Sequence, residues 1–275
     1  MTSGSTPATA YGHVCLAYDD PAGLDAWAVG YLAAGLAAGE RVALIAPGAP
    51  DELARRLDRL PGRDAALRQG ALRLLSVAQM YRSGGVVDPQ AQVRVYDAAT
   101  EEALAAGYTG LRVVAEATTL VRTAAQRDTF ARYEHLMDHY IRRRPLSVTC
   151  AYDRRELGGP AIAELACLHP ETNAEVLFRL HAATGETVVA LGGELDPSND
   201  RLFAAALDRA DPRGVDGRLL VDATGLRFVD HRNLLHLRDH ARRHGADVVL
   251  RTSRSAVGRL VELLDLPEVR VEVGR

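Results

Sequence analysis

The sequence predicts an α/β protein of two domains. Its 275 residues are too many for most single cores, and almost half of them are apolar, which is enough to bury two cores. Over the first 170 residues, short apolar runs alternate with amphipathic helical segments. This alternation is typical of a mainly parallel sheet with helices on both faces. The last hundred residues alternate in the same way and predict a second, smaller α/β unit.

In the first domain we predict buried strands wherever an apolar run is short and continuous. They cover residues 13–18, 41–46, 71–76, 111–116 and 146–152. The segments with helical periodicity are 24–38, 51–60, 89–106, 128–142 and 160–167. Two of these helices are followed by a glycine, Gly39 and Gly107, which suits the residue after a helix C-terminus.

A short polar segment, residues 169–173, marks the predicted domain boundary, because Pro170 disfavours continuation of the preceding helix. We expect a disordered tail over 1–10, a first domain over 11–170 and a second over 176–275. In the second domain a hairpin is predicted from 178–181 and 187–195, with a turn near 184–186. Its further helices are predicted at 199–210, 231–244 and 255–264, and its further strands at 218–222, 247–251 and 269–273.

Polar side chains end several of the apolar strands in the first domain, where an open parallel sheet forms its ligand crevice. We therefore predict a small-molecule site lined by Tyr18, Asp19, Glu116, Tyr152, Asp153 and His13. The plainer alternative gives each side chain a local role: a strand-start hydrogen bond for His13, and an ion pair of Glu116 with Arg122 or Arg154.

The same region holds residue types that bind metals or act as acids and bases, namely His13, Asp19, Glu116, Asp153 and His169. Their spacing matches no recognised metal motif, so we predict no metal, no cofactor and no catalytic residue. The three cysteines, Cys15, Cys150 and Cys167, lie in apolar runs and are expected to be buried hydrophobes.

Composition argues against several classes of protein. The net charge of −3 gives no basic face for nucleic acid. An odd number of thiols indicates a reducing cytoplasm. No apolar run reaches the ~18 residues of a membrane span, and residues 1–10 lack the apolar segment of a signal peptide.

Four segments of the second domain carry a resemblance to a known family: 193–196 (GELD), 220–230 (LVDATGLRFVD), 243–246 (RHGA) and 263–266 (LLDL). Together they resemble a STAS domain, the fold of the anti-sigma-factor antagonists. The resemblance implies a partner surface at the start of helix 231–244, where switching members read D-S-S-G or D-S-T-G and are phosphorylated on the second hydroxyl.

This chain departs from that pattern, because it reads Asp230, His231, Arg232 and Asn233. Arg232 stands in the place of the phosphoacceptor, and a guanidinium can neither accept a phosphate nor imitate one. We predict that these four residues bind a partner of acidic character without phosphorylation. The alternative is drift on a solvent-exposed face.

The first domain resembles the MEDS sensory domain through 13–19 (HVCLAYD), 36–42, 107–116, 150–154 and 168–170. Its beginning also resembles a RecA- or KaiC-like ATPase core. A phosphate-binding loop needs glycines and a lysine, whereas residues 18–23 read YDDPAG and the chain has no lysine. We therefore expect a degenerate RecA-like domain without ATP hydrolysis.

These expectations combine into a cytoplasmic signalling regulator that is not an enzyme. Its first domain senses a ligand and controls a STAS domain that binds an anti-sigma factor or a related regulatory protein. Self-association into a homo-oligomer is left open. The alternatives are a RecA-like enzyme, and a scaffold that senses nothing and only self-associates.

Overall fold

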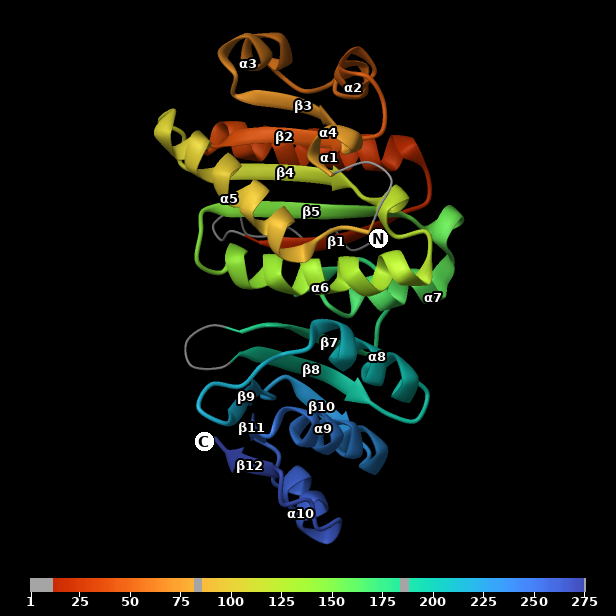
Figure 1. Ribbon diagram of the computed structural model, residues 1–275. Helices are drawn as coiled ribbons and strands as arrows, with labels where there is room; N and C mark the ends of the chain where they lie inside the picture. The colour runs from red at the N-terminus through yellow and green to blue at the C-terminus, as the bar shows by residue number, and fades with distance from the viewer. Residues whose placement is uncertain (1–11, 82–85, 184–187, 275) are drawn as a thin grey trace.

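The computed structural model describes residues 12–81, 86–183 and 188–274, so the predicted tail and the predicted turn at 184–186 lie outside the described residues. The described residues form two six-stranded sheets that follow each other along the chain (Figure 1). The first sheet is wholly parallel and the second is mixed, and helices cover both. The predicted fold class is confirmed.

The first sheet has the strand order β3-β2-β4-β5-β1-β6. Its strands are β1 (His13–Tyr18), β2 (Arg41–Ala46), β3 (Leu72–Ser76), β4 (Leu111–Glu116), β5 (Leu146–Asp153) and β6 (Glu171–Thr172). The first five were predicted, because continuous apolar runs are typical of parallel strands buried on both faces. β6 is only two residues long and lies in the predicted boundary, so hydrophobic patterning could not indicate it.

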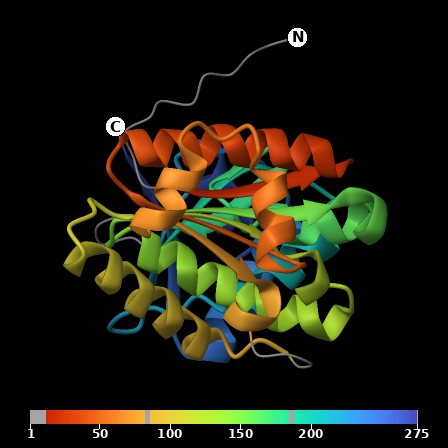
Figure 2. The ribbon, with the colours of Figure 1, turned by 90° about the horizontal axis from the view of Figure 1, so that it is seen from above.

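Helices cover both faces of this sheet, as Figure 2 shows for α1 on one face and α5 and α6 on the other. The elements are α1 (Pro21–Ala37), α2 (Pro50–Arg56), α3 (Arg63–Gln69), α4 (Val77–Met80), α5 (Pro89–Ala105), η1 (Thr118–Leu120), α6 (Ala124–Ile141) and α7 (Arg154–Ala166). None of the helices in the described part is both long and apolar enough to span a membrane.

Three of these helices begin three or more residues earlier than predicted, and local capping explains each. α1 starts after Asp20, whose side chain accepts the N–H of Gly23. α6 starts after Thr123, whose hydroxyl accepts the N–H of Gln126 in a capping box. α7 starts after Asp153, and the non-helical Gly158 (φ 79°) interrupts it before the apolar segment that the sequence indicated.

The second sheet has the order β10-β8-β9-β11-β12, and β7 pairs antiparallel with β8. The strands are β7 (Phe178–Ala182), β8 (Val189–Leu195), β9 (Arg218–Asp222), β10 (Leu226–Val229), β11 (Asp247–Thr252) and β12 (Val269–Val273), and the helices are α8 (Asp200–Ala210), α9 (His231–His244) and α10 (Ser255–Leu263). The predicted hairpin strands are thus present, whereas the short strand β10 was not predicted.

Gly193 has a steric reason to be glycine. Its φ is +96°, and a Cβ atom at this position would lie 2.1 Å from the carbonyl oxygen of Leu177. The first residue of the GELD segment therefore lets the chain entering β7 approach β8 closely.

The two sheets are joined through α6 and the outer edge of β7 (Figure 1). The N–H of Leu180 donates to the carbonyl of Cys167 at 2.7 Å, and the N–H of Ala182 donates to the Asp138 carboxylate at 2.6 Å. An uncovered strand edge would leave such groups unpaired. The first domain therefore supplies hydrogen-bond partners that the second sheet lacks.

Candidate functional site

The carboxyl ends of β1 and β5 lie side by side, and after these two strands the chain turns to opposite faces of the sheet. β1 continues into α1 on one face, whereas β5 continues into α7 on the other. Such a switch point is where open α/β sheets form a crevice. The predicted ligand residues Tyr18, Asp19, Glu116 and Asp153 all lie near this edge.

Tyr18 and Glu116 meet there, because the Tyr18 hydroxyl donates to Oε1 of Glu116 at 3.1 Å. The same oxygen accepts the N–H of Thr118 at 3.2 Å. The alternative expectation of an ion pair with Arg122 or Arg154 is wrong, because these arginines pair with other carboxylates.

Asp19 and Asp153 have separate partners at this edge. Asp19 forms an ion pair with Arg154 at 3.1 Å. Asp153 caps α7, where its Oδ1 accepts the N–H groups of Arg155 and Glu156 at 2.8 and 3.2 Å. Both carboxylates therefore fix the loops at the switch point.

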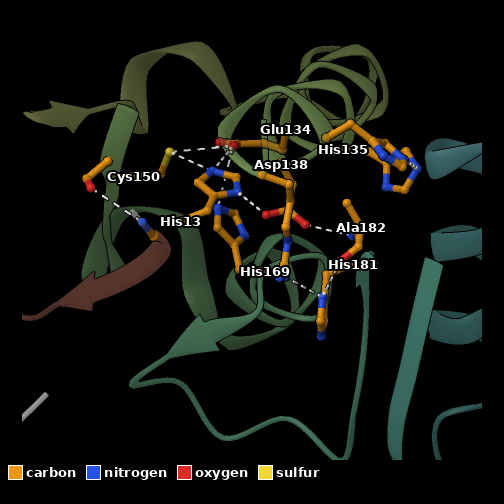
Figure 3. A network of polar contacts seen from close by, with 12 residues as sticks. His13, Glu134, His135, Asp138, Cys150, His169, His181 and Ala182 are labelled. Atoms are coloured by element: carbon orange, nitrogen blue, oxygen red, sulfur yellow. Dashed lines mark hydrogen bonds and ion pairs between the residues drawn. The ribbon is translucent and has the colours of Figure 1, made fainter. Parts of the chain in front are cut away.

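The two remaining predicted residues, His13 and Tyr152, are buried in the core of the first domain. Figure 3 shows His13 beside Glu134 of α6. Nε2 of His13 lies 2.8 Å from Oε2 of Glu134, and the Tyr152 hydroxyl donates to Oε1 of the same carboxylate at 2.6 Å. Nε2 of His169 and Sγ of Cys150 lie 3.5 and 3.4 Å from Oε2. The structure thus divides the six predicted residues between an edge group and this buried group.

Glu134 was not predicted as a site residue, although its position on α6 could have indicated that it is buried. The buried stripe of α6 runs through Phe130, Met137 and Ile141, and both Glu134 and Asp138 lie on it. Carboxylates four residues apart on an apolar stripe indicate a buried polar network, since lone charges are costly in a core.

The charges in the buried group depend on one another. Burial disfavours protonation of His13, but hydrogen bonds to Asp138 and Glu134, and their charges, outweigh it and raise the pKa of His13 to about 9. Burial also opposes ionisation of Glu134, yet the neighbouring histidines hold the pKa of this carboxyl below its usual range. Burial, followed by the Glu134 charge, raises the pKa of the Cys150 thiol well above its ordinary value.

Asp138 links this group to the second domain. Its Oδ1 lies 3.5 Å from Nδ1 of His13, and its Oδ2 accepts the N–H of Ala182 in β7 (Figure 3). One buried side chain of α6 therefore contacts both the core of the first domain and the edge of the second sheet.

The predicted partner-binding residues at the start of α9 have two roles. Asp230 and Asn233 are buried, and Oδ1 of Asp230 accepts both the backbone N–H and the side-chain amide of Asn233, at 2.9 and 2.7 Å. His231 and Arg232 are exposed. Phe228, which the sequence analysis did not single out, is 52% exposed just before them.

An aspartate caps the start of α1, where a phosphate-binding loop would present its N–H groups. Asp20 occupies the N-terminus of α1, where its Oδ1 accepts the N–H of Gly23 at 2.8 Å. A phosphate-binding loop would offer such N–H groups to the ligand.

Comparison with known protein families assigns both parts of the chain. The family model described as the methanogen/methylotroph, DcmR sensory (MEDS) domain matches residues 12–170. The model described as Mlab, STAS domain matches residues 178–271. A search of curated proteins found no match.

Proposed function

Because the chain belongs to the MEDS family of sensory domains and carries a STAS domain after it, we propose that its sensory domain controls which state of the STAS domain binds a partner protein. A regulatory role in signalling follows from the two families. The control itself is supported by one observation: helix α6 takes part in the buried core of the sensory domain and in the contact with β7.

The geometry of α6 supports transmission of a change between the domains. Glu134 and Asp138 lie one turn apart on α6. A displacement of α6 caused by a change at Glu134 therefore also moves Asp138, the acceptor of the Ala182 N–H. A packed core responds to such a shift as a unit, since it has few voids to absorb it. β7 belongs to the sheet that supports α9 through β8 and β10.

The input that we propose is a small molecule at the switch point of the first sheet. Tyr18 and Glu116 offer a hydroxyl and a buried carboxylate there, and Asp19 and Asp153 fix the adjacent loops. A ligand that displaces the Tyr18–Glu116 hydrogen bond would act on β4 and β1, against which α6 packs.

The output that we propose is an anti-sigma factor or a related regulatory protein, bound without phosphorylation at the usual position. Arg232 is exposed and has no hydroxyl, and Asn233 is held in the buried cap of α9. With His231 and Phe228, Arg232 offers a surface that suits an acidic partner with an apolar contact. A cytoplasmic location belongs to the proposal, since the three cysteines are buried and free.

The experiment compares partner binding by three charge variants of the full chain. The partner is isolated from the native host with the wild-type chain, and its affinity is measured for Arg232→Ala, Arg232→Glu and Arg218→Glu. Arg218 is an exposed arginine at the opposite end of the strands, so it controls for charge reversal as such.

We expect Arg232→Glu to weaken the complex well beyond Arg232→Ala, because it adds like-charge repulsion to the lost attraction. Arg218→Glu is expected to bind like the wild type. Equal affinity for all three variants, or phosphate on the bound wild-type chain, would contradict the proposed output.

A further inference from the structure

Four buried side chains of the first domain converge from four separate segments of the chain. His13 comes from β1, Glu134 from α6, Cys150 from β5 and His169 from the turn after α7 (Figure 3). Each offers one donor atom, and these four atoms all lie within 4.8 Å of one another. None of the four side chains is more than 3% exposed.

Three separations between the donor atoms match those of a small tetrahedral coordination shell. Zinc ligands at ~2.0–2.3 Å from the ion lie roughly 3.3–3.7 Å from one another in a tetrahedron. Sγ of Cys150 lies 3.5 Å from Nε2 of His13 and 3.4 Å from Oε2 of Glu134, which is also 3.5 Å from Nε2 of His169. The His13–Glu134 separation is 2.8 Å, a direct hydrogen-bond contact that would open by less than 1 Å.

Neighbouring groups already orient the donor atoms toward one centre. Nδ1 of His169 lies 2.9 Å from the carbonyl of Leu165, so this nitrogen carries the proton and Nε2 presents its lone pair to the centre. Nε2 of His169 is buried and makes no well-formed hydrogen bond within the described residues, although Oε2 of Glu134 lies 3.5 Å away. The Tyr152 hydroxyl holds Oε1 of Glu134, which leaves Oε2 to face the centre.

The second nitrogen of the other histidine also faces a polar group. Nδ1 of His13 lies 3.5 Å from Oδ1 of Asp138. A carboxylate behind a histidine is a common outer-shell arrangement at metal sites, since it fixes the ring and raises its basicity.

The charges of the four groups balance a divalent cation. Binding of the ion releases the proton of the Cys150 thiol and the extra proton of His13. The resulting thiolate and the Glu134 carboxylate carry two negative charges, and the two neutral histidines add none. Within the described residues, Nε2 of His169 has a long contact of 3.5 Å with Oε2 of Glu134, an oxygen that it shares with His13, and a poorly satisfied polar group is costly in a dry core. Sulfur and imidazole donors favour zinc and similar transition metals over Mg²⁺ and Ca²⁺.

We propose that His13, Glu134, Cys150 and His169 bind one divalent transition-metal ion in a tetrahedral site, with Zn²⁺ as the ion that fits these donors best. The ion fastens β1, β5 and α6 to the turn that leads into the STAS domain. It thereby stabilises the segment in which the carbonyl of Cys167 accepts the N–H of Leu180.

The test uses the full chain, purified without chelator and analysed for bound metal, and then stripped of metal and titrated with Zn²⁺ or Co²⁺. Cys150→Ser and His169→Gln remove one donor each. Cys167→Ser is the matched control, since Cys167 is an equally buried free thiol outside the four donors. His244→Gln controls for the second group of possible ligands in the described residues, Asp211, His240 and His244.

We expect one metal ion per chain, a higher midpoint of thermal unfolding with Zn²⁺, and a thiolate-to-Co²⁺ charge-transfer band with the intense visible bands of tetrahedral Co²⁺. Cys150→Ser should lose the charge-transfer band, and His169→Gln should lose stoichiometric binding. Both controls should keep wild-type behaviour.

The proposal fails if the wild-type chain neither contains metal nor responds to Zn²⁺ and Co²⁺. It also fails if His244→Gln loses the ion while Cys150→Ser keeps it. If one donor variant does not fold, the other variant and the metal response of the stripped wild-type chain still decide between these outcomes.

Discussion

Replacing Asp138 by alanine perturbs the contact between the two domains at a buried point. The side chain is 1% exposed and its Oδ2 accepts the N–H of Ala182, which is fully buried, at 2.6 Å. Alanine removes the acceptor and leaves this N–H without a partner in the interface, and it also removes the contact of Oδ1 with Nδ1 of His13. A hydrogen bond to a charged group contributes ~1.5–3 kcal/mol to stability, so we expect the free energy of unfolding to fall by about 2–3 kcal/mol.

Asp128 provides the matched control, because it lies on the same helix and also bridges the domains, to Arg209 at 2.8 Å. Its side chain is 57% exposed, and an exposed ion pair contributes only ~0–1 kcal/mol. Asp138→Asn is the conservative variant, since its carbonyl oxygen can still accept the Ala182 N–H.

Thermal and urea unfolding of the full chain measure these differences. For a chain of this size, a loss of ~1 kcal/mol lowers the midpoint by about 2–4 °C, so Asp138→Ala should lower it by roughly 5–10 °C. Asp138→Asn should recover part of the loss, and Asp128→Ala should change little. Equal, small effects of Asp138→Ala and Asp128→Ala would refute the argument that Asp138 joins the domains.

Three further predictions follow from local geometry. Gly193→Ala should destabilise the STAS domain by more than ~1 kcal/mol in urea unfolding, because the Cβ collides with the chain at Leu177, whereas Gly62→Ala, also at positive φ but in open space, should cost less; equal costs would contradict the steric argument. ATP with Mg²⁺ should give neither hydrolysis nor a thermal shift, since Asp20 occupies the start of α1, and hydrolysis lost on changing Asp19 would overturn this. Arg232→Ser should remain a poor kinase substrate by intact-mass analysis, since buried Asn233 stands where family members have glycine; stoichiometric phosphorylation would show that the cap is no obstacle.

Strands β1 to β5 could be predicted because each is a short, mostly apolar run, and such runs have few alternatives in an α/β chain. The helix over 231–244 was predicted to the residue, because Asp230 and Gly245 are strong signals for its two ends. Elements without hydrophobic periodicity, such as β6 and β10, gave no comparable signal.

The buried group could not be assembled from the sequence alone. His13 and Cys150 come together only because β5 lies beside β1, although more than a hundred residues separate them. The spacing of His13, Glu134, Cys150 and His169 along the chain reflects strand order and not a local motif. The sequence indicated His13 and His169 as residues of a type that binds metals. It could not predict that the Glu134 carboxylate and the Cys150 thiol would lie beside them.

The side chains at the carboxyl ends of the first sheet, in contrast, could be brought together from the sequence. Parallel strands must end at the same edge, so the sequence could predict that Tyr18, Glu116 and Asp153 lie near one another. It could not predict which face each side chain takes, because a strand buried on both faces has no polar alternation to indicate it. Tyr152 therefore points toward α6, away from Tyr18.

The central claim is that a change in the core of the sensory domain reaches the STAS domain through α6. Hydrogen exchange of the Leu180 and Ala182 amides in β7 measures this most directly, because both amides donate to acceptors in the sensory domain. The perturbation is Tyr152→Phe, which removes the hydroxyl that donates to Glu134 in the core of the first domain. The control is Tyr140→Phe, which removes a hydroxyl on the outer side of the same helix, where it donates to Asp97.

The account predicts faster exchange of the Leu180 and Ala182 amides in Tyr152→Phe than in the wild type, with no change in Tyr140→Phe. β11 lies in the same sheet as β7 but is separated from it by β8 and β9, so its amides should keep their protection in both variants. If Tyr152→Phe alters exchange within the first domain but leaves Leu180 and Ala182 as protected as in the wild type, α6 does not transmit the change and the account is contradicted.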